Sequence, residues 1–468
     1  MTFEEFKIIH TEIANAIKGS KYEDIAFYTN GCVRNIYLAK NVPHINICIS
    51  LKNGAKEFAD FLATKLGIYS EDTKYANPIN FPSIGKSELM LPSIEDKTPP
   101  CYITIKEPSK TIVSETQKFE YGTMLEDAYS KDFTVNALYC KISSRLVFDA
   151  IGNAKKDLDE KILRCCSDPT KTFSDSPIRI LRAVRIASEL GFAIPSDTWV
   201  GMCKNVRKLY FTNKLEIQRE LNKIFLIDKP SDAIRKLYHC GALEIIMPEV
   251  CWLKNIKQGV SHYEDAFDHS LTVMDKTQPI LEHRIAGLLH DLGKQTALET
   301  NLFGDIKFTN HEDLSIDLAE MLLEDLKYDE VTINKVSMAI KNHTRFKRVY
   351  NPSNHSIKKF IEEVELENVD VCLDVIEANN TSHTPKYCIE GQTEMIKRRI
   401  KSIIEKKSDP KKDVKLPING NDIMVKFKIK KGPLIGKCLE GLKEYMLVNP
   451  KMTKEEAFEI ISKDFIPF

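Results

Sequence analysis

KDFTVNAL at residues 131–138 and SPIRILRAVRIASELGF at residues 176–192 are the two stretches that decide the fold of this chain. The first is a charged pair followed by an apolar segment. The second spaces its apolar residues so that a helix would bury one broad face. Ser176 is suited to cap that helix and Pro177 to occupy its first turn. The two stretches therefore lie on either side of a predicted domain boundary.

The chain before KDFTVNAL alternates strand and helix signals. Residues 24–29, 44–50 and 101–106 are rich in β-branched and aromatic residues, which predicts three strands. The amphipathic pattern at 57–67 predicts a helix. The Pro-rich segment 77–100 is expected to form a long loop or an insertion. A sheet backed by helices is the arrangement that this alternation indicates.

From about residue 150 the apolar pattern is helical almost throughout. The predicted fold class is therefore multidomain α+β: an N-terminal mixed α/β head followed by an all-helical neck, body and tail. The predicted domains are a head at 1–145, a neck at 146–230, a body at 231–400 and a tail at 401–468.

Composition and charge exclude several classes. The 468 residues carry 67 basic and 67 acidic side chains, so the chain is not a globally basic nucleic-acid binder, although the stretch 397–415 is locally basic. No apolar stretch approaches the roughly 18 residues of a membrane helix, so we expect no membrane partner. The 12 cysteines contain no Cys-x-x-Cys pair, and the N-terminus does not have the pattern of a secretory signal. These features predict a cytoplasmic protein with reduced thiols.

The second half of the chain holds a set of histidines around one adjacent His-Asp pair. Two polar neighbours in the apolar context LLHDLGK are costly unless they are paired or bind a metal. Imidazoles and carboxylates suit an ion of the Mn, Ni, Zn or Fe type, which turns water into a nucleophile for phosphate esters. The metal ligands predicted from this pattern are His269, His290, Asp291, His311 and His343.

Together, these stretches resemble the tRNA nucleotidyltransferase/poly(A) polymerase family of the CCA-adding type. NGCVRNIYLAKNVPHINICIS at 30–50 resembles its first motif, and LLHDLGK resembles the central motif of the HD phosphohydrolase superfamily. The resemblance runs from Gly31 to about Phe465. It implies a nucleotidyltransferase-like head, a neck of the RNA- and nucleotide-binding type, an HD body and a small helical tail. Members add CCA or poly(A) to RNA 3′ ends with magnesium, CTP and ATP.

The resemblance also assigns roles to particular residues. It implies that Asp132 lies near the incoming ribose and that Lys294 contacts phosphate, both as catalytic candidates. Asn379 stands where the HD superfamily has a closing Asp ligand. Nucleotide or RNA contacts are implied for Gly31, Arg34, Lys131, Arg179 and Arg182.

The chain departs from the family pattern at the head metal site. His44 and Asn46 occupy the positions of its Asp-x-Asp pair, and the strand at 101–106 contains no carboxylate. Glu107 and Asp127 are the nearby carboxylates that could replace one. Neutral side chains offer far less charge to magnesium. We therefore expect the head site to be degenerate.

Three hypotheses follow from the sequence. The chain is a divergent or inactive polymerase that still binds the 3′ end of tRNA or another RNA, or its working centre is the HD body, which hydrolyses a phosphoester. The third hypothesis is that neither site works and that the chain is an RNA-binding pseudoenzyme.

Overall fold

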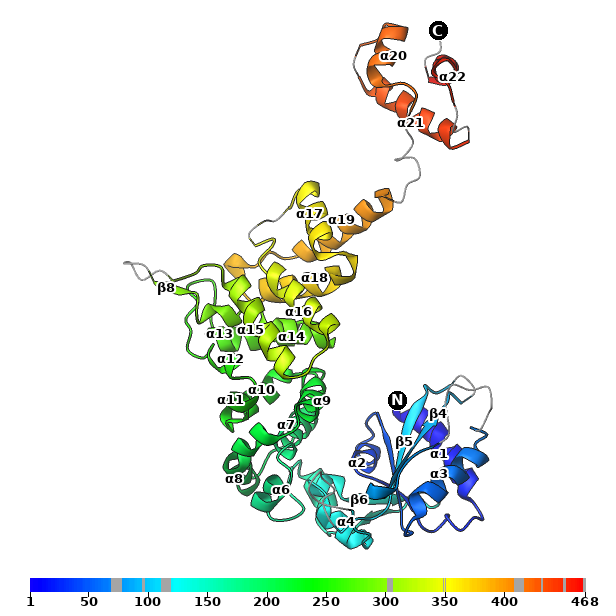
Figure 1. Cartoon of the computed structure of the whole chain (residues 1–468), viewed down its shortest axis with the longest axis vertical. Helices are drawn as coiled ribbons and strands as arrows, with labels where there is room; N and C mark the ends of the chain where they lie inside the picture. Colours follow the sequence, from blue (N-terminus) through cyan, green and yellow to red (C-terminus); the bar gives the residue numbers. More distant parts are fainter. Residues whose placement is uncertain are drawn as a thin grey trace.

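The structure is a computed structural model of the chain. It describes residues 1–68, 78–94, 97–110, 119–300, 306–347, 349, 351–407, 416–430, 432–448 and 452–465. Figure 1 shows an elongated molecule in which the N-terminal sheet lies near one end and the last helices lie at the other. The predicted α+β class is confirmed, with a sheet-containing head followed by helices. The basic stretch 397–415 lies partly outside the described residues.

A seven-stranded sheet forms the centre of the head, in the order β3-β4-β5-β2-β1-β6-β7. The pair β2–β5 is parallel, and the other described neighbours are antiparallel. The three predicted strands are confirmed as β1, β2 and β5. The strand bounds are β1 Ala26–Thr29, β2 Ile45–Ile49, β3 Ile79–Phe81, β4 Lys86–Leu91, β5 Cys101–Lys106, β6 Leu138–Lys141 and β7 Val147–Asp149.

The long loop expected at 77–100 is wrong, because the described part of that segment contains the hairpin β3–β4. The sequence KSELML of β4 alternates so that Ser87, Leu89 and Leu91 are buried while the residues between them are partly exposed. That period of two outweighs the prolines at both ends of the segment. Residues 77, 95 and 96 lie outside the described part.

The two faces of the sheet are covered differently. One face packs its isoleucines, such as Ile47 and Ile105, against α1 and α3 in the main apolar core. The other face packs Cys48 and Tyr139 against α4 and leaves the far ends of β2 and β5 uncovered. The helix bounds are α1 Phe3–Ile17, α2 Gly31–Tyr37, α3 Gly54–Lys65 and α4 Met124–Ser130.

Beyond β7, the regular elements of the described residues are helices and one pair of short strands, β8 Leu298–Thr300 and β9 Ile306–Phe308. The neck and the start of the body comprise α5 Ala154–Asp159, α6 Pro169–Asp175, α7 Arg179–Leu190, α8 Ser196–Asn205, α9 Lys214–Phe225, α10 Pro230–His239, α11 Ala242–Ile246 and α12 Pro248–Cys251. The remaining helices are α13 Ala266–Lys276, α14 Leu281–Leu289, α15 His311–Asp325, α16 Glu330–Asn342, α17 Asn354–Val364, α18 Val369–Thr381, α19 Gln392–Lys407, α20 Gly420–Phe427, α21 Pro433–Val448 and α22 Lys454–Ile460.

The expected cap at Ser176 is wrong. Ser176 ends the short helix α6 with φ −149°, and α7 begins three residues later, at Arg179. The capped helix is α6, which precedes α7. Asp168 accepts a hydrogen bond from the Lys171 amide at 2.7 Å, and Pro169 is the first residue of α6. This start leaves Pro177 in the turn between the two helices.

Besides the small cluster between the sheet and α4, two larger apolar cores are found among the described residues. The main core runs from α1 to α19, so the head, neck and body share one continuous buried cluster. The helices α20, α21 and α22 form their own cluster around Ile423, Cys438 and Leu442. None of the described helices is long and apolar enough to cross a membrane.

Candidate functional site

A cleft of about 1790 Å³ lies between the sheet of the head and the helices α7 and α9 of the neck. Its position follows from the fold, because the ends of β2 and β5 left uncovered by α4 face the neck. The residues predicted for the head site all line this cleft: Gly31, Arg34, His44, Asn46, Lys131, Asp132, Arg179 and Arg182. The structure therefore brings together residues that are up to about 150 positions apart in the chain.

His44 precedes β2, and Asn46 is the second residue of that strand. The neighbouring strand β5 contains no carboxylate. Asn46 is paired in register with Thr104 of β5. The Nε2 atom of His44 lies 2.7 Å from the Thr104 hydroxyl. Burial lowers the pKa of His44, so its imidazole is neutral at pH 7. This end of the sheet therefore offers neutral groups where two negative charges would be needed to hold magnesium tightly.

Glu107, just beyond β5, is engaged by backbone amides of the head. Its Oε2 atom accepts a hydrogen bond from the Asn53 amide at 3.0 Å, and its Oε1 atom accepts one from the Ala55 amide at 3.3 Å. Both amides belong to the start of α3, where backbone N–H groups lack partners within the helix. Glu107 thus caps α3, and it also lines the cleft.

Asp132 is the centre of a buried polar network. Its Oδ2 atom accepts a hydrogen bond from Arg182 at 2.9 Å, and its Oδ1 atom accepts one from the Asn136 amide group at 2.9 Å. Arg34 in turn donates to Asn136 at 3.0 Å. Burial disfavours the charged carboxylate, but Arg182 and Arg179 outweigh that effect and hold the pKa of Asp132 well below its usual range. The predicted ribose residue is therefore ionised and held firmly by the neck.

The neck arginines are held by a second buried acid. Glu220 of α9 lies 2.8 Å from Arg185 and 4.0 Å from Arg182. Arg179 donates to the Ser130 carbonyl at 2.8 Å. Carboxylates and a carbonyl thus fix the guanidinium groups of α7 at the edge of the cleft, so their positions are set before any ligand arrives.

A hydrogen bond joins the side chains of Lys131 and Asn30 at the start of α2. Lys131 donates to the Asn30 side chain at 3.0 Å and lies 3.0 Å from the Asp127 carboxylate. Asn30 has φ 58° and ψ −147°, a backbone conformation that is strained for any residue with a side chain. That conformation brings Gly31 and the first amides of α2 to the wall of the cleft.

A second candidate site is buried in the body, where five helices contribute polar side chains to one point. His269 comes from α13, Asn379 from α18, and His311 begins α15. His290 and Asp291 follow α14, and His343 follows α16. The six residues predicted as metal ligands are therefore brought together, although they span 111 positions in the sequence.

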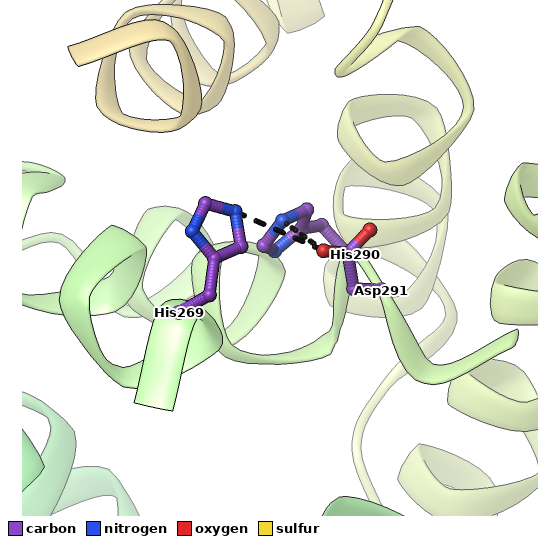
Figure 2. A group of neighbouring side chains, drawn as sticks. All are labelled: His269, His290 and Asp291. Carbon is purple, nitrogen blue, oxygen red and sulfur yellow. Dashed lines mark ion pairs between the residues drawn. The ribbon is translucent and has the colours of Figure 1, made fainter. Parts of the chain in front are cut away.

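Asp291 lies between two groups of histidines. Its Oδ2 atom is 3.0 Å from Nε2 of His290 and 3.8 Å from Nε2 of His269, the arrangement drawn in Figure 2. Its Oδ1 atom is 3.4 Å from Nε2 of His311 and 3.6 Å from Nε2 of His343. Two triads, each with ligand atoms within 4.8 Å of one another, therefore share this aspartate. Asn379 extends the first triad, because its Oδ1 atom is 3.1 Å from His269.

Backbone carbonyls orient three of these imidazoles. The Nδ1 atom of His290 is 2.9 Å from the Gly287 carbonyl, and that of His343 is 2.6 Å from the Ile340 carbonyl. The Nδ1 atom of His311 likewise lies 3.1 Å from the Phe308 carbonyl. A proton on each Nδ1 leaves the Nε2 lone pair facing the centre, which is the second-sphere arrangement typical of metal-bound histidine.

Both oxygens of Asp291 and Nε2 of His290 are buried, and none of the described groups meets hydrogen-bond geometry to them. Burial raises the pKa of Asp291, but His290 and Lys294 outweigh it and keep that pKa well below its usual range. Lys294 lies 2.6 Å from Oδ2 and donates to Gln258 at 2.6 Å. A buried carboxylate without hydrogen bonds, surrounded by oriented imidazoles, fits divalent ions of the Mn, Ni, Zn or Fe type.

The spacing between the two triads depends on a close backbone contact at Gly293. A Cβ atom at this position would lie 2.3 Å from the His311 carbonyl oxygen and 2.8 Å from the Ser315 amide nitrogen. The Gly293 amide also donates to the Ser315 hydroxyl at 2.8 Å. The turn after Asp291 and the first turn of α15 therefore touch directly.

Three residues near the centre were missed by sequence reasoning. The His262 ring lies 4.5 Å from the His269 ring and 4.6 Å from that of His383. Burial, together with the charge of Lys294, lowers the pKa of His262 to about 3. Gln258 holds Lys294, as described above. The sequence signal for His383 was its position four residues after Asn379. Its Nδ1 atom lies 2.8 Å from the Asn379 carbonyl. His262 and Gln258 precede α13, and no such signal marked them.

Three family models match the chain in succession. The poly A polymerase head domain matches residues 26–164, the probable RNA and SrmB-binding site of polymerase A matches residues 191–253, and the HD domain matches residues 266–380. The matched residues include the head side of the cleft and the six predicted metal ligands, whereas α7 lies between the first two matches.

Curated proteins and solved structures agree with these matches. The chain is 24% identical to the CC-adding tRNA nucleotidyltransferase of Thermus thermophilus, over 72% of this chain and 76% of that protein. It is 34% identical to the multifunctional CCA protein of Pseudomonas fluorescens strain Pf0-1, but over 37% of this chain and 43% of that protein.

Among solved structures, the Bacillus stearothermophilus CCA-adding enzyme in complex with CTP has the same fold. The TM-score is 0.58 at 16% identity, covering 97% of this chain and 95% of that one. A complex of a CCA-adding enzyme with ATP matches with a TM-score of 0.54 at 17% identity, covering 98% and 95%.

Proposed function

Since the chain belongs to the tRNA nucleotidyltransferase/poly(A) polymerase family, we propose that it acts on the 3′ end of an RNA, with its metal-dependent chemistry in the body. The head and neck bind the RNA end, and the histidine centre hydrolyses a phosphoester. Nucleotide addition in the head is impaired. The predicted cytoplasmic location belongs to this proposal, because a reducing compartment suits the twelve unpaired cysteines.

One observation carries the proposal: Asp291 is a fully buried carboxylate whose two oxygens lack hydrogen bonds and approach four imidazoles. Lys294 pairs with one oxygen of this carboxylate, but four imidazoles also face it, so a divalent cation held between them is the natural further complement. His269, His290 and Asp291 would hold one ion, with Asn379 beside them, and Asp291, His311 and His343 would hold a second. A bound ion of this type lowers the pKa of water and neutralises phosphate charge.

Other residues of the chain orient the metal ligands, exclude water and provide a positive charge for phosphate. Backbone carbonyls set the imidazole orientation, and burial excludes bulk water from the ligands. Lys294, with its ammonium group 2.6 Å from Asp291, is placed to receive a phosphate oxygen at the edge of the centre.

The cleft supports RNA binding for two reasons. Arg179 and Arg182 are fixed at its wall, and Phe211 lines it while 86% exposed. An exposed aromatic ring beside basic groups is the arrangement that stacks bases of single-stranded RNA. The impaired head follows from His44 and Asn46, because two carboxylates would otherwise balance the charge of magnesium.

The first experiment measures metal content and hydrolysis. The purified chain should retain a transition metal and hydrolyse bis(p-nitrophenyl) phosphate or an RNA with a 3′-terminal phosphate. Asp291→Ala should lose both properties, whereas Asp232→Ala, which alters an exposed carboxylate of α10, should keep them. A chain with no bound metal and no hydrolysis in added Mn²⁺ or Ni²⁺ would refute the hydrolase and favour an RNA-binding module.

The second experiment tests the head. A tRNA transcript without its CCA end is incubated with CTP, ATP and Mg²⁺ or Mn²⁺, beside an active CCA-adding enzyme. We expect no extension by this chain. Addition of C and A would show instead that His44 and Asn46 are tolerated in a working polymerase.

A further inference from the structure

Lys106 stands at the uncovered end of the sheet, directly opposite another lysine. The register pairs Lys106 of β5 with Lys86 of β4, so both side chains project from the same face. On the other side, β5 runs parallel to β2, which carries Asn46 two residues before the partner of Lys106. Lys106 and Asn46 both line the cleft. Two like charges directly across a strand pair destabilise a sheet unless something compensates them.

The neighbouring charges leave Lys106 uncompensated. Lys86 is paired with Glu88 at 2.5 Å, and Lys131 with Asp127 at 3.0 Å. Among the residues that the structure describes, no carboxylate lies within ion-pair distance of Lys106, although its side chain is exposed to the cleft. Partial removal of the ammonium group from bulk water inside the cleft is the main effect that lowers its pKa to about 8, and the charges of Lys131 and Lys86 lower it further.

Carboxylates that might instead attract a divalent cation are already engaged. Glu107 is held by the amides at the start of α3, and Asp127 also accepts from the Ser109 amide at 3.1 Å. His44 is neutral and bonded to Thr104. The end of the sheet is thus positive, with an unpaired ammonium group where a metal-dependent site would need negative charge.

We propose that Lys106, with Lys131 and Lys86 beside it, forms a phosphate-binding site that works without a divalent ion. This inference rests on the proposed use of the cleft for RNA ends but not on hydrolysis in the body. The ligand is a phosphate group, carried by a nucleoside triphosphate or by the RNA itself. Its negative charge would pair with Lys106 and relieve the repulsion across β4 and β5.

The experiment measures binding of ATP and of an RNA oligonucleotide with a 3′-terminal phosphate, each in EDTA and in Mg²⁺. We expect the dissociation constant of at least one ligand to be the same in both conditions within about twofold. Lys106→Gln should weaken that binding about tenfold, the loss typical of a hydrogen bond to a charged group. The matched control Lys52→Gln, which alters an exposed lysine of the head outside the cleft, should bind as the unmodified chain does.

Lys106→Arg keeps the charge and should restore binding, which separates a charge effect from misfolding. The two ligands identify the source of the phosphate. Binding that disappears in EDTA, or that Lys106→Gln leaves unchanged, would overturn the proposal. EDTA should also stop hydrolysis by the body, so the two proposals are tested separately. No hydrolysis in added Mn²⁺ or Ni²⁺ would refute the hydrolase, while binding that persists in EDTA would still support this site.

Discussion

At the scale of single residues, Asn30 has a strained backbone conformation. Its φ is 58° and its ψ is −147°. A side chain in this region costs on the order of 1–3 kcal/mol. The contact with Lys131 accompanies the strained conformation and links it to the cleft.

Asn30→Gly should therefore raise the free energy of unfolding by about 1 kcal/mol, because relief of strain exceeds the extra flexibility of glycine in the unfolded chain. Urea denaturation followed by circular dichroism would measure the change. Asn53→Gly is the control, since Asn53 has φ 58° and ψ 19°, a conformation that asparagine tolerates. An equal gain in both variants would argue against strain at Asn30.

A second prediction at this scale concerns pH. Phosphate binds protonated Lys106, whose pKa lies near 8, so affinity for ATP should fall as the pH rises from 7 to 9. Lys106→Gln should flatten this dependence. A profile that is unchanged in Lys106→Gln would assign the titration to another group. The other charged or titratable groups around Lys106 are Lys86, Glu88, His44, Asp127, Lys131 and Arg182.

At the scale of elements, a series of ion pairs, in which acidic and basic side chains alternate, connects α9 and α7 to the head. Glu220 of α9 is 5% exposed and holds Arg185 and Arg182, and Arg182 in turn holds Asp132. Removing one member of such a network leaves the partners as uncompensated charges.

Glu220→Gln should lower the free energy of unfolding by about 2–3 kcal/mol, less than for a fully buried pair because Arg182 is partly exposed. Glu216→Gln, one turn earlier on an exposed part of the same helix, should change it by less than about 0.5 kcal/mol. The urea midpoints of the two variants give the comparison. Similar midpoints would mean that the network contributes little to stability.

The elements also show what the sequence could predict. The strands β1, β2 and β5 and the helix α3 followed from local periodicity. The hairpin β3–β4 did not, because prolines at its ends obscured the alternation of KSELML. The six residues around Asp291 could be listed from their order in the chain. The sharing of its carboxylate between two triads, and the proximity of His262, depend on how five helices pack, which no local pattern encodes.

The same limit applies to the cleft. The substitutions His44 and Asn46 were visible in the sequence, and so was the absence of a carboxylate from residues 101–106. The position of Lys106 opposite Lys86 required the strand register, which pairs β5 with a strand that was expected to be a loop. The bonds of Glu107 to the start of α3 likewise became visible only in the folded structure.

At the scale of the whole molecule, the separate cores divide stability into parts. The head, neck and body share one buried cluster, while α20, α21 and α22 have their own. An ion that binds the folded body but not the unfolded chain stabilises the shared cluster, by about 2.7 kcal/mol at a hundred times its dissociation constant.

A chain ending at Lys407 should therefore keep both candidate sites. We expect Mn²⁺ to raise its melting temperature as much as that of the full chain, and Asp291→Ala to abolish the rise in both. Calorimetry with and without EDTA measures this effect. Loss of the Mn²⁺ effect in the shortened chain would show that the last helices support the body.

The direct backbone contact at Gly293 sets the distance between the turn after Asp291 and the first turn of α15. With no atom beyond Cα to separate them, the turn that carries Asp291 and the helix that begins with His311 are as close as two backbones can lie. The smallest added side chain would act as a wedge between the two halves of the centre. If the histidine centre binds metal as proposed, Gly293 would influence the choice of ion radius without coordinating the ion, and Gly293→Ala would alter that choice.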